Sequence, residues 1–182
     1  MRLRFCESEI DYWANCYTEY QESAGMHHVE NEEKVIGFRK EIQRRGHLTQ
    51  YHLYKVIDWV LSVYGVDAVG SASRNHETLI EISTRQAFTS VDDWEKLMTM
   101  TELRGIRQTT ASAILHLYDK EQYPILSGRA LWSVEEPKRD YYPDWFWLQY
   151  IQFCRDIVKR NEIEMRTLDR ALWFYSYDSR EC

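Results

Sequence analysis

Proline and glycine are scarce in this chain, and their scarcity limits its fold more than any other feature of the sequence. The 182 residues include only 3 prolines and 7 glycines. An all-β fold needs many tight turns, and these two residues are the usual means of making them. The chain is 44% apolar and 14% aromatic, which is enough to bury one substantial core. The sequence therefore predicts an all-α fold, organised as a single domain over residues 1–182.

Apolar residues at helical spacing predict about eight or nine helices. The most regular stripe begins after Thr49 and stops at Gly65, with Leu53, Val56, Ile57, Val60 and Tyr64 on one face. Further helices are predicted over about 7–23, 31–45, 76–89 and 164–177. Two more are predicted from their first residues: one opens with a capping box of Ser90 and Asp93, and one begins at Pro143. The remaining helices flank two short breaks, at residues 103–105 and 124–128, which carry the functional argument.

No stretch of the sequence approaches the roughly 20 consecutive apolar residues of a membrane-spanning helix. Residues 1–6 run directly into charged residues, without the apolar core of a signal peptide. We therefore expect a cytoplasmic protein with no membrane partner.

The cysteines and histidines follow no metal-binding spacing. Cys6, Cys16, Cys154 and Cys182 are too far apart for a paired motif, and we expect them to be free thiols. The pair His27 and His28, and His47 with His52, match no zinc pattern. We therefore expect no metal site and no cofactor.

The net charge of −6 argues at first against a nucleic-acid partner, because Lys and Arg contacts with phosphate supply most of the sequence-independent affinity. The negative charge is concentrated in residues 1–33, which hold eight acidic residues against Arg2 and Arg4. The other 21 acidic residues are balanced by 21 basic ones, and residues 103–139 carry a net charge of +2. We call residues 1–33 the acidic N-terminal segment.

The most specific local signal lies at residues 103–115. A helix ends near Glu102, the chain turns at Arg104-Gly105, and a second helix begins with small residues that allow close packing. This is the pattern of a helix-hairpin-helix. Unpaired backbone N–H groups in the turn and the next helix attract phosphate. The candidate DNA-binding residues are Leu103, Arg104, Gly105, Arg107, Thr109 and Thr110. The alternative is a simple turn between two packed helices.

The run resembles the hairpin of the DNA glycosylase superfamily that includes endonuclease III and the adenine glycosylases. The family pattern reads Leu-Pro-Gly-Val-Gly, two variable residues, then Thr-Ala. It is matched in place by Leu103, Gly105, Ile106, Thr110 and Ala111. Arg104 replaces the usual proline, and Arg107 replaces the second glycine.

The resemblance covers about residues 48–177 and is strongest over 97–134. Residues 123–131 look like the loop that leads into the helix carrying the family's catalytic aspartate, and Ser127 occupies the aspartate position. Thr109 occupies the position of the lysine in bifunctional members, so a lyase based on that lysine is not expected. Residues 166–173 are similar to the closing helix of small bacterial proteins of the superfamily. Arg129, in the loop region, is either a further DNA contact or a solvated surface charge.

Base excision requires stabilisation of the positive charge that develops on the sugar, a role suited to a carboxylate. Ser127 carries no charge, so three explanations stay open. In the first explanation, another carboxylate stabilises the charge. One candidate is Glu135, which is eight residues further on and is expected on the same helix face. The other is Asp169, whose alternative role is an ion pair with Arg166 and Arg170. Alternatively, the excised base leaves easily, or catalysis has been lost.

Two functions from different classes follow. The first is a monofunctional DNA glycosylase that excises a damaged or modified base, with modified phage DNA as one source. The second is a non-catalytic helix-hairpin-helix module or regulator that binds DNA. A third hypothesis, separate from these two, is that the acidic N-terminal segment covers the DNA face or recruits a protein partner. The aromatic residues between 123 and 150 are expected mainly in the core, with stacking on flipped bases as the alternative.

Overall fold

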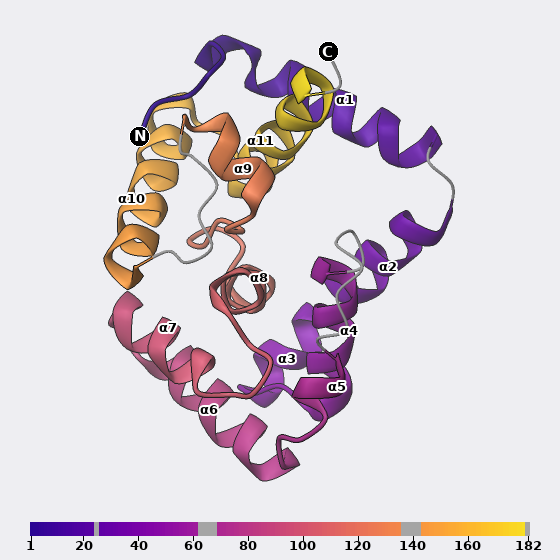
Figure 1. Cartoon of the computed structure of the whole chain (residues 1–182), viewed down its shortest axis with the longest axis vertical. Helices are drawn as coiled ribbons and strands as arrows, with labels where there is room; N and C mark the ends of the chain where they lie inside the picture. The colour runs from indigo at the N-terminus through magenta and orange to yellow at the C-terminus, as the bar shows by residue number, and fades with distance from the viewer. Residues whose placement is uncertain (24–25, 62–68, 136–142, 181–182) are drawn as a thin grey trace. The chain divides into compact units, whose positions relative to one another are not determined.

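The computed structural model describes residues 1–23, 26–61, 69–135 and 143–180 (Figure 1). All the regular secondary structure in these ranges is helical, with no strand among them, which confirms the all-α prediction. The chain forms two compact units. Unit 1 combines Met1–Met26 with Asp119–Cys182, and unit 2 is the uninterrupted stretch His27–Tyr118. The single domain remains a prediction.

Unit 2 is built around one central helix. Its helices are α2 (Met26–Gly37, which begins at the unit boundary), α3 (Arg39–Arg45), α4 (Gln50–Leu61), α5 (Val69–Ala72), α6 (Glu77–Thr89), α7 (Asp93–Thr101) and α8 (Gln108–Tyr118). Helix α8 packs against α3, α4 and α7, and every residue from Thr110 to Leu117 is buried. Small side chains such as Ala111 and Ala113 allow these close approaches.

The predicted core stripe lies on α4, where Leu53, Val56 and Ile57 are fully buried. The end of that stripe, Tyr64 and Gly65, falls outside the described residues.

The single helix predicted over 31–45 is wrong, because α2 and α3 are separated at Phe38. Val35 and Ile42 are nevertheless both buried, so the break keeps the apolar face continuous. Gly46, with φ +70°, ends α3.

Helices α6 and α7 pack against each other. The side chain of Asp92 caps α7 by accepting hydrogen bonds from the backbone N–H groups of Trp94 and Glu95, at 2.7 and 3.0 Å. The predicted capping box of Ser90 and Asp93 is therefore wrong. Ser90 instead donates a hydrogen bond to the carboxylate of Glu95 and accepts one from the Asp92 N–H.

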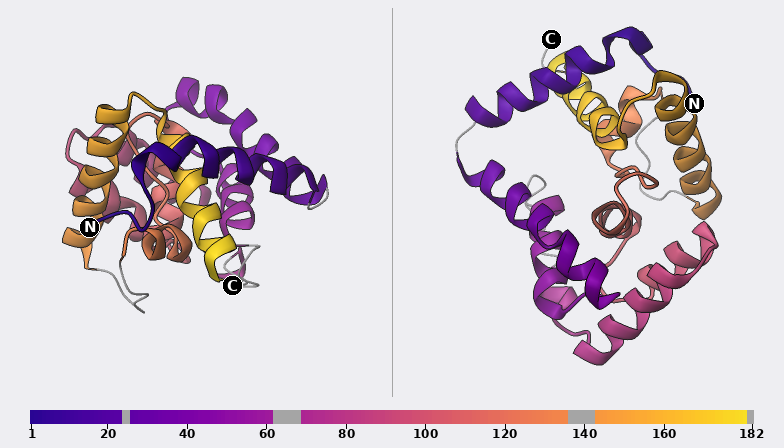
Figure 2. Two further views of the ribbon diagram at one scale, coloured as in Figure 1. Left: turned by 90° about the horizontal axis from the view of Figure 1, so that it is seen from above. Right: turned by 180° about the vertical axis from the view of Figure 1, so that it is seen from behind.

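Unit 1 gathers helices from both ends of the chain. It contains a 3₁₀ turn (Glu7–Glu9), α1 (Ile10–Ser23), α9 (Gly128–Ser133), α10 (Asp144–Asn161) and α11 (Met165–Arg180). Helix α11 packs against α1, α9 and α10, and the contact of α1 with α11 is visible in both figures (Figures 1 and 2). The first residues are tied to α9, since the Arg4 N–H donates to the Ser133 carbonyl.

The helices predicted from Pro143 onward and over 164–177 are confirmed as α10 and α11. On α10, Trp147, Ile151 and Cys154 are buried, and their i, i+4, i+7 spacing places them on one helix face. No helix within the described residues is long and apolar enough to cross a membrane. Cys6, Cys16 and Cys154 carry free thiols, and Cys182 lies outside the described part of the chain.

Candidate nucleic-acid interface

The hairpin between α7 and α8 has the predicted turn. The backbone N–H of Ile106 donates to the Leu103 carbonyl at 3.1 Å, which closes a tight turn around Arg104 and Gly105. Gly105 has φ +79°, a conformation that residues with a side chain adopt at a cost. Helix α8 begins three residues later, at Gln108, and its first backbone N–H groups have no carbonyl partner within the helix.

A buried asparagine from a distant segment fixes this turn. The side chain of Asn75, 3% exposed, accepts a hydrogen bond from the Arg104 N–H at 2.9 Å and donates one to the Arg104 carbonyl at 2.8 Å. It also donates to the Ala72 carbonyl at the end of α5. The amide therefore holds both backbone polar groups of the residue at the tip of the hairpin.

This contact requires a backbone N–H at position 104. A proline at position 104 has no N–H and would lose the bond to Asn75, whereas arginine provides it. The backbone at Arg107 carries no strain from a positive φ. Among the described residues, positive φ at a non-glycine residue occurs at Glu135 and Glu162, not at Arg107.

The side chains of the hairpin divide into buried and exposed groups. Leu103, Ile106 and Thr110 are buried, so Leu103 and Thr110 support the turn from inside. Arg104 and Arg107 are exposed, and Thr109 is half-buried. The two arginines are therefore the hairpin side chains that solvent reaches most freely.

Ser127 caps helix α9. Its backbone is extended, with φ −127° and ψ 155°, and its hydroxyl accepts a hydrogen bond from the Ala130 N–H at 3.1 Å. The side chain is half-buried. The hydroxyl thus already serves as a helix cap, and its proton is available to a second acceptor.

Asp169 supports the loop that leads to Ser127. Its side chain, 4% exposed, accepts a hydrogen bond from the Ile125 N–H at 3.1 Å, and the Tyr150 hydroxyl donates to the Ile125 carbonyl at 3.3 Å. Burial raises the pKa of Tyr150 well above its usual value, and the charges of Cys154 and Asp169 act in the same direction. The structure thus connects Asp169 to the loop two residues before Ser127.

The other predicted carboxylate is engaged elsewhere. Helix α9 ends at Ser133, and Glu135 has φ +57°, so the predicted shared helix face of Ser127 and Glu135 is wrong. The exposed Glu135 carboxylate accepts two hydrogen bonds from Arg2, at 2.8 and 3.1 Å. These bonds lower the pKa of Glu135.

Arg129 lies against the aromatic side chains of α11. Its guanidinium carbon is 4.9 Å from the centre of the Trp173 ring and 5.1 Å from that of Tyr177. The Arg129 side chain is half-buried. Arg166 and Arg170 lie near the Tyr17 ring, each 5.7 Å from its centre.

The aromatic residues between 123 and 150 are mainly core, as predicted. Tyr123, Phe146, Trp147 and Tyr150 are each at most 3% exposed. Trp132 is half-buried and Trp145 exposed, whereas Tyr141 and Tyr142 fall outside the described residues.

The predicted site residues fall into both units. The hairpin belongs to unit 2, and Ser127, Arg129, Glu135 and Asp169 belong to unit 1. No group of three or more His, Cys, Asp or Glu side chains in the described ranges is arranged to hold a metal ion. Comparisons with models of protein families, with curated proteins and with solved structures gave no match for the chain.

Sequence reasoning missed Asn75 and the partner of Glu135. Asn75 follows a short helix, and nothing local links it to a turn 29 residues further on. Arg2 lies 133 residues before Glu135. Arg2 stands out in the sequence as one of two arginines in the acidic N-terminal segment, but the sequence does not indicate which carboxylate it contacts.

Proposed function

We propose that this chain is a helix-hairpin-helix DNA-binding protein of the glycosylase type. Its hairpin binds the phosphate backbone of DNA, and the protein excises a damaged or modified base. The observation that carries the proposal is the hairpin turn. Its tip is fixed by Asn75, its glycine has the required positive φ, and Arg104 and Arg107 are exposed beside the start of α8.

This geometry suits a phosphate contact for physical reasons. The first N–H groups of a helix attract an anion, and the helix dipole adds favourable potential. A turn that is already fixed loses little conformational entropy on binding. The two exposed arginines add positive charge to a chain whose net charge is negative, so we expect a small interface with few phosphate contacts.

The excision half of the proposal depends on a carboxylate. Asp169 is the better of the two predicted residues, because it is buried and bonded to the loop that carries Ser127. Glu135 is already neutralised by Arg2 on the surface. With Thr109 at the lysine position, the reaction would be hydrolysis by water without a covalent amine intermediate.

A second candidate function is DNA binding without catalysis. It is favoured by Ser127, whose hydroxyl caps α9 and brings no negative charge to the position expected of a catalytic aspartate. The two candidates share the hairpin and differ only in whether a glycosidic bond is broken.

Duplex binding tests the shared part. The Arg107→Glu variant should bind duplex DNA about tenfold more weakly at low salt, and its salt dependence should have a slope smaller by about one phosphate contact. Arg44→Glu is the matched control, because it makes the same charge change at an exposed residue of α3. Equal losses in both variants would leave the hairpin contact without support.

Base excision tests the rest. The protein is incubated with duplexes that carry alkylated, deaminated or phage-type modified bases, and abasic sites are then cleaved with alkali. Strand breaks on one substrate class favour the enzyme. Binding to these duplexes with no breaks on any of them favours the non-catalytic module.

A further inference from the structure

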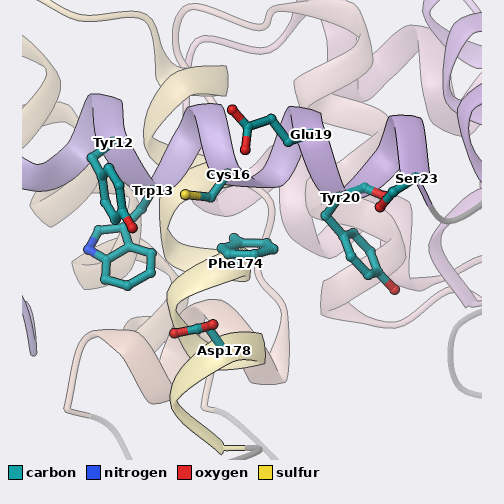
Figure 3. A pocket seen from close by; sticks show the side chains of 8 residues that line it. All are labelled: Tyr12, Trp13, Cys16, Glu19, Tyr20, Ser23, Phe174 and Asp178. Atoms are coloured by element: carbon teal, nitrogen blue, oxygen red, sulfur yellow. The ribbon is translucent and has the colours of Figure 1, made fainter.

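A pocket of about 460 Å³ lies on unit 1 between α1 and α11, and the proposed DNA contacts do not use it (Figure 3). Helix α1 contributes most of its lining, and α11 contributes two residues. The lining residues are Tyr12, Trp13, Cys16, Glu19, Tyr20, Ser23, Phe174 and Asp178.

Four aromatic rings form its walls. Phe174 lies at the centre, with Trp13 and Tyr12 to one side and Tyr20 to the other (Figure 3). The centre of the Phe174 ring is 6.3 Å from that of Trp13 and 6.0 Å from that of Tyr20. Tyr12 packs edge-on against Trp13 at 4.9 Å. The pocket therefore presents several ring faces and edges within one ligand-sized space.

The charge of the pocket is negative. Glu19 and Asp178 are exposed at its rim, and no Lys or Arg belongs to the lining. Helix α1 itself carries three acidic residues and no basic one. Within the described part of the chain, neither Glu19 nor Asp178 forms an ion pair. The pKa of Tyr12 is raised, first by its hydrogen bond with the Cys16 thiol, next by burial, and last by the charges of Asp178 and Glu19.

The same two helices show how such rings are used inside the protein. Arg129 lies over Trp173 and Tyr177, and Arg166 and Arg170 lie over Tyr17. In each case an internal cation meets aromatic rings of α1 or α11. In the pocket, the rings are accompanied by carboxylates instead, and no Lys or Arg among the described residues belongs to the lining.

We propose that this pocket binds an organic ammonium group, supplied either by a small amine or by a lysine side chain of a partner protein. The ring faces attract the cation through their quadrupoles, and the apolar walls accept the carbon atoms attached to the nitrogen. Glu19 and Asp178 add Coulomb attraction at the rim, which weakens as salt rises. The acidic N-terminal segment, through its α1, thereby provides a cation-binding surface.

This inference does not rest on the proposed function. A phosphate backbone would be repelled by the two carboxylates, so the pocket and the hairpin take ligands of opposite charge. Failure of one proposal therefore leaves the other standing.

Choline and its uncharged counterpart 3,3-dimethylbutan-1-ol distinguish a cation site from an apolar hollow, because they have nearly the same shape and differ in the charge. Both are titrated into the whole chain while the aromatic NMR signals of Trp13, Tyr20 and Phe174 are followed. Choline should shift these signals with saturation at low salt, and the alcohol should shift them much less. Equal effects of both compounds, or no saturable shift with any cation, would overturn the proposal.

Variants locate the site. Phe174→Leu should weaken choline binding about two- to fivefold, the range expected for one exposed cation–π contact. Asp178→Asn, an exposed change that leaves the packing intact, should weaken it similarly and reduce its salt dependence. Glu22→Gln is the matched control, since Glu22 is exposed on α1 but does not line the pocket. If Glu22→Gln weakened choline binding as much as Asp178→Asn, the effect would come from the net charge of the protein, and the proposed pocket would be contradicted.

Two further probes identify the source of the ammonium group. Spermidine represents a free amine, and a blocked Gly-Lys-Gly peptide represents a protein side chain. Tighter binding of one or the other assigns the source, and competition with choline shows that both enter the same pocket. Binding of neither, or binding without competition, counts against the proposal.

Discussion

The side-chain amide of Asn75 bonds to both the backbone N–H and the backbone carbonyl of Arg104, at 2.9 and 2.8 Å. The Asn75 side chain thereby takes the place of water as the hydrogen-bond partner of these two backbone groups. The turn is fixed from the interior, and the arginine side chain remains exposed.

Asn75→Ala should destabilise the fold by about 1–3 kcal/mol, because it leaves buried polar groups without their partner. It should also weaken DNA binding, since the turn loses its fixed shape. Urea unfolding and duplex titration measure the two effects. Ser73→Ala, an exposed change two residues earlier, should alter neither by a comparable amount.

Gly105→Ala should cost about 1–2 kcal/mol, because φ +79° is strained for any residue with a Cβ. Gly128→Ala provides the control. A Cβ at Gly128 meets no atom within 4 Å, and alanine is the better helix former, so this change should be neutral or stabilising. Equal unfolding midpoints for the two variants would mean that the turn does not hold the conformation described.

Ser127→Ala should remove the cap of α9 and cost about 1 kcal/mol. Ser127→Asp should retain the cap, because a carboxylate also accepts the Ala130 N–H and suits a helix N-terminus. If the position is a vacated catalytic site, the aspartate variant should also gain slow excision through stabilisation of the sugar cation. A folded, DNA-binding Ser127→Asp that is inert on every lesion would rule out that idea.

Asp169→Asn and Glu135→Gln separate the two candidate carboxylates. If Asp169 supports excision, its amide variant should lose at least about tenfold in rate, because the charge disappears while an oxygen still accepts the Ile125 N–H. Glu135→Gln should change the rate little, and the loss of its exposed pair with Arg2 should change stability little, because solvent screens the interaction. Single-turnover excision assays give the rates, and the reverse order of losses would exchange the roles.

His52 should make stability depend on pH. Its side chain is buried in α4, and burial lowers the pKa of the imidazole, although Glu41 acts in the opposite direction. The unfolded chain therefore binds more protons as the pH falls below about 6.5, and stability decreases with acidification there. His52→Gln should reduce the change in urea midpoint between about pH 7.5 and pH 5. His76→Asn, exposed and still able to cap α6, should leave it intact.

The sequence predicted the features that depend on residues close together in the chain. The stripe of Leu53, Val56 and Ile57 and the glycine of the hairpin each follow from spacing or backbone conformation within a few residues. The break at Phe38 escaped prediction, because the apolar period of Val35 and Ile42 continues through it.

Long-range pairings could not be predicted. Asn75 and Arg2 each find a partner through tertiary folding, and the side chains alone do not indicate which one. The position of Glu135 was wrongly predicted because the end of α9 also depends on a distant segment. Helix α9 ends at Ser133, whose carbonyl accepts a hydrogen bond from the Arg4 N–H near the N-terminus. The aromatic contacts of α1 with α11 likewise join the two ends of the chain.

The pairing of α1 with α11 has a consequence for biosynthesis. On the ribosome, α1 is made before α9, α10 and α11, so its packing partner α11 is synthesised well after it. Residues His27–Tyr118 emerge without interruption and can collect all their own partners while translation continues. The aromatic face of α1 therefore stays uncovered by α11 until that helix has been made, whereas unit 2 can fold before it.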